Sequence, residues 1–264
     1  MFSSSTMHRE VVAIRVDATN YREASNQIIE WAGHGESRYV CAAPVSSVME
    51  AYDDSKLQHM FHNADMVTPD GMPLVWSLRL LGVRHATRVY GPDLTLSVLA
   101  SAALNGVPVG LFGGMPAVAD LFSQRMCERF PGLRIVFNYS PPFRELSSEE
   151  DAQLVARIEE SGTRILLVGL GNPKQERWMA MHKGSVAAVM LGVGAAFDFL
   201  AGTKPQAPRW LMGLGLEWMF RLLTEPRRLW KRYLKHNPRF VALMIMQLLG
   251  LGQYRDRKVK AHSP

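Results

Sequence analysis

The chain has 264 residues, of which 47% are apolar and 20% charged, and its net charge is +6. This composition excludes an intrinsically disordered chain, and the length suits one large α/β domain with an appendage or two small domains. The two cysteines, Cys41 and Cys127, match neither a disulfide framework nor a zinc site. We expect both to be buried free thiols of a reducing compartment.

The apolar runs of the chain bear on its localisation. Residues 1–10 are polar and lack the apolar core of a signal peptide, and no apolar run reaches the roughly 20 residues that span a bilayer. The longest candidate, residues 240–254, would form a helix of about 22 Å, shorter than the ~30 Å hydrocarbon layer. We therefore expect a cytoplasmic protein, held peripherally on the inner face of the cytoplasmic membrane.

Short β-rich segments alternate with helical patterns through the first 200 residues or so. Such alternation implies crossover connections, so residues 1–204 are predicted to form a Rossmann-like catalytic body, an α/β fold with a mainly parallel sheet and helices on both faces. The predicted strands are residues 11–16, 39–43, 66–68, 107–112, 134–139, 165–168 and 187–191, and the predicted helices include residues 21–32, 92–105, 117–130 and 148–161.

The last quarter of the chain is strongly basic. Residues 209–260 hold 12 Lys or Arg and three acids, so this segment carries +9 and the rest of the chain −3. Strand signals stop near residue 205, and helices are predicted over residues 210–223, 227–235 and 240–249. Because basic charge, tryptophan and an apolar stretch occur together, we expect residues 205–264 to form a basic helical appendage on an anionic membrane surface. A helical core element with a solvated basic face is the alternative.

Two loops that follow predicted strands carry candidate site residues, since ligands of open α/β sheets bind beyond the carboxyl ends of the strands. In the first loop Asp70 stands between a proline and a glycine, where its carboxylate either points outward or caps the helix that starts near Met72. In the second, Gly113 and Gly114 precede a helix. That arrangement admits a phosphate, and a plain tight turn explains it equally well.

Two further loops follow later strands. One joins a glycine turn at Gly171 to Lys174 and Gln175, and because a turn needs neither side chain, a functional role is favoured. The other sets Asp198 between two phenylalanines, where it binds ribose hydroxyls or a base edge, or is a buried cap. Two glycine turns indicate a diphosphate ligand. The sequence has no Asp-x-Asp pair and no metal-binding cluster, so we expect Arg, Lys and backbone N–H groups, and no metal, to stabilise a leaving diphosphate.

Several blocks, in order over roughly residues 10–240, resemble the WecG/TagA/CpsF glycosyltransferases. The resemblance implies a Rossmann-like body with a C-terminal helical appendage that meets the membrane. It implies an inverting transferase without metal or cofactor, moving a sugar from a UDP-sugar to a polyprenyl-diphosphate-linked saccharide in bacterial exopolysaccharide or cell-wall polymer synthesis. The blocks are Pro69-Asp70-Gly71-Met72-Pro73, Arg88-Val89-Tyr90-Gly91-Pro92-Asp93-Leu94, Gly169-Leu170-Gly171, Pro173-Lys174-Gln175-Glu176, Phe197-Asp198-Phe199 with Ala201-Gly202, Gly215-Leu216-Glu217-Trp218 and Glu225-Pro226-Arg227-Arg228.

The resemblance also suggests roles for individual positions. Asp70 resembles the proposed catalytic base of the family, and Arg88 and Gln175 match positions held to contact the sugar donor or its phosphates. Asp198 matches a position on the nucleotide side. The appendage arginines thought to reach the diphosphate correspond to Arg221 and Arg228.

The chain departs from the family pattern at three positions. Lys231 stands where another arginine is expected. The family often has Thr and Asn in the loop after the second strand, and by spacing from Asp70 these fall on Ala42 and Pro44, which donate no side-chain hydrogen bond. The sugar pocket is therefore expected to differ, and UDP-glucose is an alternative to an N-acetylmannosamine donor.

Two rival classes are less consistent with the sequence. A non-catalytic nucleotide-binding regulator or basic nucleic-acid-binding protein would explain the charge, but no nucleic-acid motif is present, so nucleic acid is not an expected partner. A nicotinamide-dependent oxidoreductase would explain the α/β body, but the G-x-G-x-x-G fingerprint is missing. Whether the chain forms a homo-oligomer is left open by the sequence.

Overall fold

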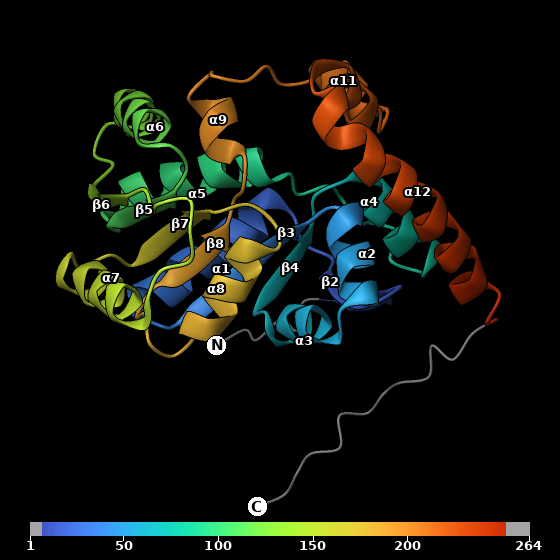
Figure 1. The fold of residues 1–264 in the computed structure, drawn as a ribbon, viewed down its shortest axis with the longest axis horizontal. Coiled ribbons are helices and arrows are strands. Elements are labelled where there is room, and N and C mark those ends of the chain that lie inside the picture. Colours follow the sequence, from blue (N-terminus) through green and yellow to red (C-terminus); the bar gives the residue numbers. More distant parts are fainter. Residues whose placement is uncertain (1–6, 252–264) are drawn as a thin grey trace, which may run out of the picture.

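The computed structural model describes residues 7–251 and contains a six-stranded sheet with helices on both faces (Figure 1). The strands lie in the order β4–β3–β8–β7–β5–β6, and every neighbouring pair is parallel. The predicted α/β class with a mainly parallel sheet is thus confirmed. The strands are β3 (Arg38–Ala43), β4 (Met66–Pro69), β5 (Val109–Gly113), β6 (Ile135–Tyr139), β7 (Ile165–Gly169) and β8 (Val189–Gly192).

The central strands are apolar on both sides, which is why helices cover both faces. In β7, Ile165 and Leu167 pack into one core cluster, whereas Leu166 and Val168 pack into the other. Strands buried on both faces are typical of parallel sheets. One face is covered by α1 (Tyr21–Gly33), α5 (Gly91–Asn105), α6 (Pro116–Arg129) and α9 (Ala196–Leu200), and the other by α2 (Val45–Asp53), α3 (Ser55–Asn63), α7 (Ser148–Glu160) and α8 (Lys174–His182).

The segment 11–16, expected to be one strand, is part of a hairpin. Strands β1 (His8–Val11) and β2 (Ile14–Asp17) pair antiparallel in a sheet of their own, against which α4 (Met72–Leu80) packs. Val12 turns the chain with a φ of 59°, a conformation that β-branched residues rarely adopt. No turn signal was therefore visible in the sequence. The Val12 N–H donates to Gln247 Oε1 at 2.8 Å, so a distant helix supports the turn.

The two cysteines differ in burial, contrary to the expectation that both are buried. Cys41 in β3 is buried, and its desolvation holds the pKa of the thiol well above its usual value. Cys127 is exposed. In that turn of α6 the neighbouring Met126 faces the core, so Cys127 points away from it. Both thiols are free.

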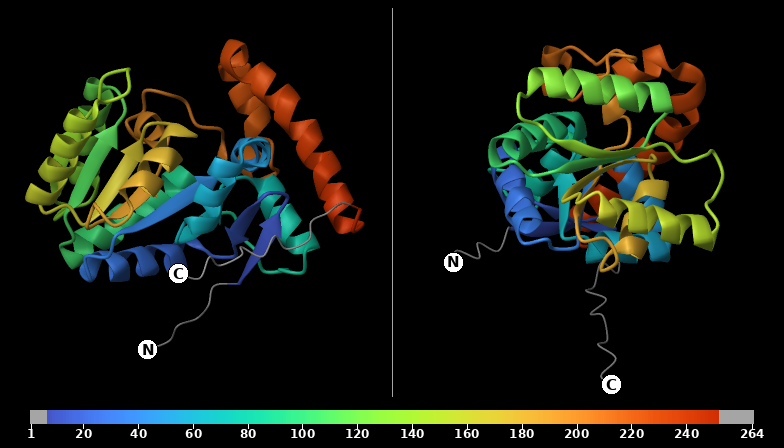
Figure 2. Two further views of the ribbon diagram at one scale, coloured as in Figure 1. Left: turned by 60° about the horizontal axis from the view of Figure 1, so that its bottom comes forward. Right: turned by 90° about the vertical axis from the view of Figure 1, so that its left-hand side faces the viewer.

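The C-terminal helices are α10 (Arg209–Gly213), α11 (Glu217–Thr224) and α12 (Pro226–Leu248), here called the appendage (orange to red in Figures 1 and 2). The helix expected over residues 210–223 is divided near Gly215, which has a φ of 73°. The two helices expected on either side of Pro238 are instead one helix. Pro238 faces solvent, where water can satisfy the carbonyl that loses its partner. The boundary near residue 204 stays a prediction, and residues 252–264 lie outside the described part.

One stripe of α12 docks onto the body beside α2 (Figure 2). Its buried residues, Leu229, His236, Phe240 and Met244, recur at helical spacing. Asp53 of α2 pairs with Arg239 at 2.7 Å and with Lys235 at 3.7 Å. Farther along the helix, Gln247 Nε2 donates to the Glu10 carbonyl at 2.8 Å. Helix α12 is therefore held at both its middle and its end.

The opposite side of the appendage is apolar and exposed, and we call it the outer apolar face. Along α12, its members recur on one side of the helix. Within residues 7–251, no helix is both long and apolar enough to cross a bilayer. The outer apolar face consists of Trp210, Leu214, Leu223, Trp230, Leu234, Val241, Ile245, Leu248 and Leu249.

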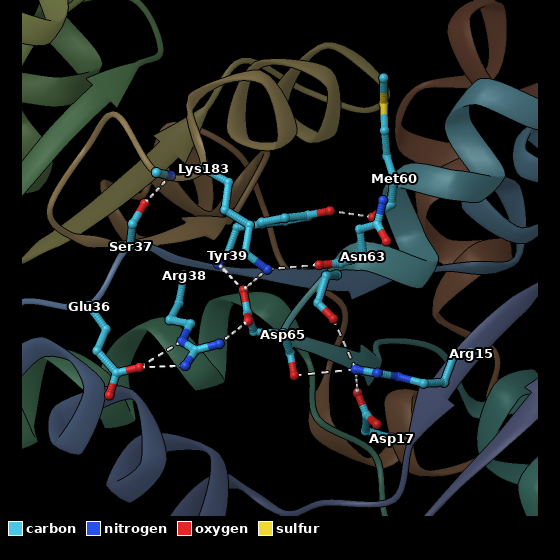
Figure 3. Close-up of polar contacts among 12 residues, drawn as sticks. Arg15, Asp17, Glu36, Ser37, Arg38, Tyr39, Met60, Asn63, Asp65 and Lys183 are labelled. Atoms are coloured by element: carbon cyan, nitrogen blue, oxygen red, sulfur yellow. Dashed lines mark hydrogen bonds and ion pairs between the residues drawn. The ribbon is translucent and has the colours of Figure 1, made fainter. Parts of the chain in front are cut away.

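Charged side chains at the amino ends of β3 and β4 form a network that we call the amino-end cluster (Figure 3). Asp65 pairs with Arg38 at 2.8 Å and with Lys183 at 2.9 Å, and it accepts the Tyr39 N–H at 2.9 Å. Each charged group of the cluster has a partner of opposite sign. The charged members are Arg15, Asp17, Glu36, Arg38, Asp65 and Lys183. This cluster joins β3, β4 and α8 at the end of the sheet away from the loops predicted to bind ligands.

Candidate active site

A pocket lies where β3 and β4 end, between the body and the appendage. Its body wall contains Pro44, which follows β3, and Asp70, which follows β4. Its remaining wall comes from α11 and α12, so two regions far apart in the sequence build one site. The residues of the pocket that carry charge or hydrogen-bonding side chains are Ser46, Asp70, Arg88, Glu217, Arg221, Arg232, Tyr233, His236 and Asn237.

Asp70 stands at the centre of the candidate chemistry. It does not cap α4, whose N-cap is Gly71 with no side-chain hydrogen bond. Instead its Oδ1 accepts the Gly91 N–H, the first of α5, at 2.9 Å. Within residues 7–251, its Oδ2 receives no hydrogen bond from the protein. One carboxylate oxygen is therefore fixed by the backbone, and the other is available to a ligand.

The electrostatic surroundings of Asp70 raise its proton affinity. Burial raises the pKa of the carboxyl above its usual value; Arg88 opposes this shift, Glu217 adds to it, and the Gly91 N–H and Arg221 oppose it. A carboxyl with a raised pKa is a stronger base once ionised. The position of Asp70 thus suits removal of a proton from a bound hydroxyl.

Arg88 is fixed by three contacts. Its Nε donates to the backbone carbonyl of Asp70, its guanidinium pairs with Glu217, and the group lies over the Tyr90 ring with Cζ 4.4 Å from the centroid. Glu217 belongs to α11, so this buried ion pair joins the appendage to the loop that carries the candidate base. The sequence showed the block around Glu217 but assigned that residue no role.

The appendage presents two unpaired guanidinium groups to the pocket. The Nε atoms of Arg221 and Arg232 are buried without a hydrogen-bond partner, and neither arginine forms an ion pair within the described residues. Burial holds the pKa of Arg232 below its usual value. Arg228, predicted to reach the diphosphate, instead pairs with Glu225 at 2.6 Å and is outside the pocket lining. An anion is the ligand that two such cations attract.

Gln175 and its neighbours are outside the lining of this pocket. Gln175 is buried, its Oε1 accepts the Gly194 N–H at 3.1 Å, and its Nε2 donates to Glu176 at 3.0 Å. The side chain therefore joins the segment that follows β7 to the loop that follows β8. Lys174 is exposed at the start of α8, and Gly171 adopts a φ of 78°.

The remaining predicted positions also have local partners. A Cβ on Gly113 would lie 2.6 Å from the Gly169 carbonyl carbon, and the Gly114 N–H donates to the Gly169 oxygen at 3.1 Å. Close approach of two turns thus explains the paired glycines. Asp198 pairs with Lys204 at 3.3 Å. Of the predicted residues, the structure brings together Asp70, Arg88 and Arg221, and it leaves the glycine turns and Asp198 outside the pocket lining.

Sequence reasoning missed Arg232 and His236 because the local pattern did not show which side of the helix docks against the body. In one continuous helix, Arg232 lies three residues after Leu229 and four before His236, on the stripe that faces the body. Lys231, which stands where an arginine was expected, is exposed and lies 5.6 Å from the ring centroid of Trp230. The periodicity of the buried residues would have identified the inward-facing arginine.

A comparison with protein-family models agrees with this geometry. The model described as the glycosyl transferase WecG/TagA/CpsF family matches residues 9–254, nearly the whole chain. The motif blocks that carried the resemblance therefore reflect common descent along the body and the appendage together. The protein is thus an enzyme that transfers sugars, and the chain belongs to the WecG/TagA/CpsF family of glycosyltransferases.

Proposed function

We propose that the protein moves a hexose from a UDP-sugar to a polyprenyl-diphosphate-linked saccharide in bacterial exopolysaccharide or cell-wall polymer synthesis. The observation that carries the proposal is Asp70, with one oxygen free, in a pocket whose opposite wall holds unpaired Arg221 and Arg232. A base next to cations that form no ion pair within the described residues suits a reaction that takes up one proton and releases an anion.

The proposed mechanism is a single displacement. The acceptor hydroxyl oxygen attacks the anomeric carbon and gives its proton to Asp70 Oδ2, while the bond from that carbon to the UDP oxygen breaks on the opposite face. The leaving UDP takes the bonding electron pair, and Arg88, Arg221 and Arg232 stabilise its charge without a metal. The anomeric configuration is inverted because only one displacement occurs.

The order of the strands supports a proposal for where the donor binds. Loops after β5 and β7 carry Gly113, Gly114, Gly171 and Lys174, and Asp198 follows β8. These loops lie toward the middle of the sheet, whereas Asp70 follows its edge strand β4. We assign UDP to the loops after the central strands, with its diphosphate reaching the edge of the pocket where Arg88, Arg221 and Arg232 lie, and the acceptor to the pocket beneath the appendage.

The membrane is the proposed source of the acceptor. The outer apolar face carries two tryptophans, Trp210 and Trp230, and basic residues such as Arg227 and Lys231 are exposed on α12. Aromatic and basic side chains together favour an anionic lipid–water interface. A peripheral position on the inner face of the cytoplasmic membrane would place the pocket close to a lipid-linked substrate.

The experiment that tests this function is UDP release by the full-length protein with a panel of UDP-sugars, a lipid-diphosphate saccharide acceptor in detergent, and EDTA throughout. We expect release with one donor that depends on the acceptor and is unaffected by EDTA. Acceptor-independent release with every donor, or release abolished by EDTA, would contradict the proposal.

A further inference from the structure

Four buried polar atoms that find no hydrogen-bond partner within residues 7–251 surround the pocket beside Asp70. They are Ser46 Oγ, His236 Nδ1 and the Nε atoms of Arg221 and Arg232. A buried polar group without a partner destabilises the fold, so such groups are uncommon in native proteins. The two arginines are accounted for by the phosphates of the proposed reaction. Ser46 and His236 require a different explanation.

Ser46 lies in the first turn of α2, whose N-cap, Pro44, offers no side-chain hydrogen bond. The residue is 5% exposed and lines the pocket. The adjacent serine, Ser47, is equally buried, but its Oγ accepts from Asn172 Nδ2 at 2.8 Å. The two neighbouring serines therefore differ. Ser47 joins α2 to the loop after β7, whereas the Ser46 hydroxyl is free beside the pocket.

His236 lines the same pocket from the appendage side. It is 6% exposed and lies on the docked stripe of α12. Burial lowers the pKa of its imidazole below the usual value, Lys235 and Arg232 lower it further, and Asp53 opposes them. The ring is therefore neutral near pH 7, with one nitrogen that donates and one that accepts. Asn237, the next residue, lines the pocket too.

Neutral groups that both donate and accept match the hydroxyls of a carbohydrate. We propose that Ser46, His236 and Asn237 bind hydroxyls of the acceptor's sugar and determine which saccharide the enzyme accepts. This inference rests on the proposed function, in which the acceptor is a lipid-diphosphate saccharide. The acceptor is favoured over the donor because the pocket contains the candidate base and lies at the edge of the sheet, beneath the outer apolar face.

The specificity expected from such a subsite follows from its buried polar atoms. A site built to bind a hydroxyl rejects a ligand that lacks it, because the protein group is then left unpaired. Each neutral hydrogen bond contributes about 2–10-fold in affinity. The hydrogen bond from Ser46 and the one from His236 would each raise the affinity for the acceptor sugar by a factor of this size.

The test is equilibrium binding without any UDP-sugar. The probes are a short-chain polyprenyl diphosphate that carries one glucose or one N-acetylglucosamine, a disaccharide form of each, and the same lipid diphosphate without sugar. The wild-type protein is expected to bind at least one glycosylated probe more tightly than the sugar-free probe. In Ser46→Ala and His236→Phe that preference should fall about 2–10-fold, with affinity for the sugar-free probe retained.

Two control variants separate recognition from folding. Ser25 is 1% exposed and donates to Ser97 Oγ at 2.7 Å, far from the pocket in the α1–α5 interface. Ser25→Ala should keep the sugar preference and melt about 2–4 °C lower, because it loses a satisfied hydrogen bond. Ser46→Ala should melt at the wild-type temperature or higher, because its hydroxyl has no partner. His236→Gln, which can still hydrogen-bond, should restore part of the preference.

Because no donor is present, the result does not depend on sugar transfer, and the failure of the proposed reaction would be seen separately in the UDP-release assay. An equal loss of affinity for sugar-free and glycosylated probes would assign these residues to phosphate and overturn the inference. So would a wild-type protein that prefers no glycosylated probe, or variants that lose affinity for a UDP-sugar instead.

Discussion

Charged side chains are paired at the amino end of the parallel sheet, whereas two arginines at its carboxyl end form no ion pair within the described residues. At the amino end, Asp65 meets both Arg38 and Lys183 within 2.9 Å (Figure 3). At the carboxyl end, Arg221 and Arg232 have buried Nε atoms without partners. Buried charge is costly unless it is paired. The amino end is therefore arranged for stability, and the carboxyl end retains a cost that an anionic ligand would remove.

The largest expected effect concerns Asp70, the group at the carboxyl end with one free oxygen. Asp70→Asn should bind UDP-sugar as the wild type does and lose about 10²–10⁴-fold in turnover, because the amide cannot accept the proton. Turnover and donor affinity should be measured on the same preparation. A variant that kept a tenth or more of wild-type turnover would show that Asp70 is not the base.

A smaller effect is expected on the outer apolar face. Trp230→Glu should weaken binding of the full-length protein to anionic liposomes by about 10-fold or more, because the tryptophan side chain could no longer enter the interface. Turnover on a water-soluble acceptor should stay near the wild-type value. The matched control is Leu104→Glu, an exposed apolar residue on α5 in the body. Equal liposome binding by all three proteins would contradict a membrane role for this face.

Glu217, on the appendage, allows a test of whether the appendage sets the pKa of Asp70. Its negative charge raises the pKa of Asp70, so removing that charge in Glu217→Gln should lower this pKa. Activity requires ionised Asp70 and rises with pH through its pKa. The acid limb of the pH–activity profile should therefore move to lower pH, with a plateau reduced about tenfold or less because the base is weaker. An acid limb that did not move would mean that Glu217 acts only as a structural partner of Arg88.

The next effect is on stability rather than activity, and it also concerns the carboxyl end. Burial raises the pKa of Glu176 to about 7, and its Oε2 has no hydrogen-bond partner. Because the folded pKa exceeds the unfolded value of 4.5, the protein loses stability as pH rises from about 4.5 to 7. Glu176→Gln should remove this loss, which is on the order of 3 kcal/mol at pH 8. Denaturant titrations at pH 5 and pH 8 would check it, and an equal gain at both would refute the titration of Glu176.

The sequence was sufficient for the features that depend on local pattern. Alternating strands and helices predicted the parallel sheet, and the loop position of Asp70 predicted its place at a carboxyl end. The errors came where tertiary contacts override local signals. Val12 turns a hairpin without a turn residue because Gln247 supports its N–H, and Pro238 stays inside a helix because its face is solvated.

The candidate site could be predicted only in part, because half of its wall comes from the appendage. Arg88 and Arg221 were identified by position, and both line the pocket. Glu217 and Arg232 were not identified, since their roles depend on how α11 and α12 dock against the body. Gln175 was predicted to contact the donor, and this stays a prediction. In the structure its side-chain amide is hydrogen-bonded to Gly194 and Glu176.

The most direct test of the contrast between the two ends is one experiment on two variants, Asp65→Asn and Arg232→Gln, with unfolding free energy and acceptor-dependent UDP release measured on each. Asp65→Asn should lose about 1–3 kcal/mol of stability, because the amide no longer pairs with the partly exposed Arg38 and Lys183, and keep its turnover while folded. Arg232→Gln should keep or gain stability and lose about 10²–10³-fold in turnover. The opposite pattern, with Arg232→Gln unstable and fully active, would contradict the claim that the carboxyl end holds its unpaired charge for the reaction.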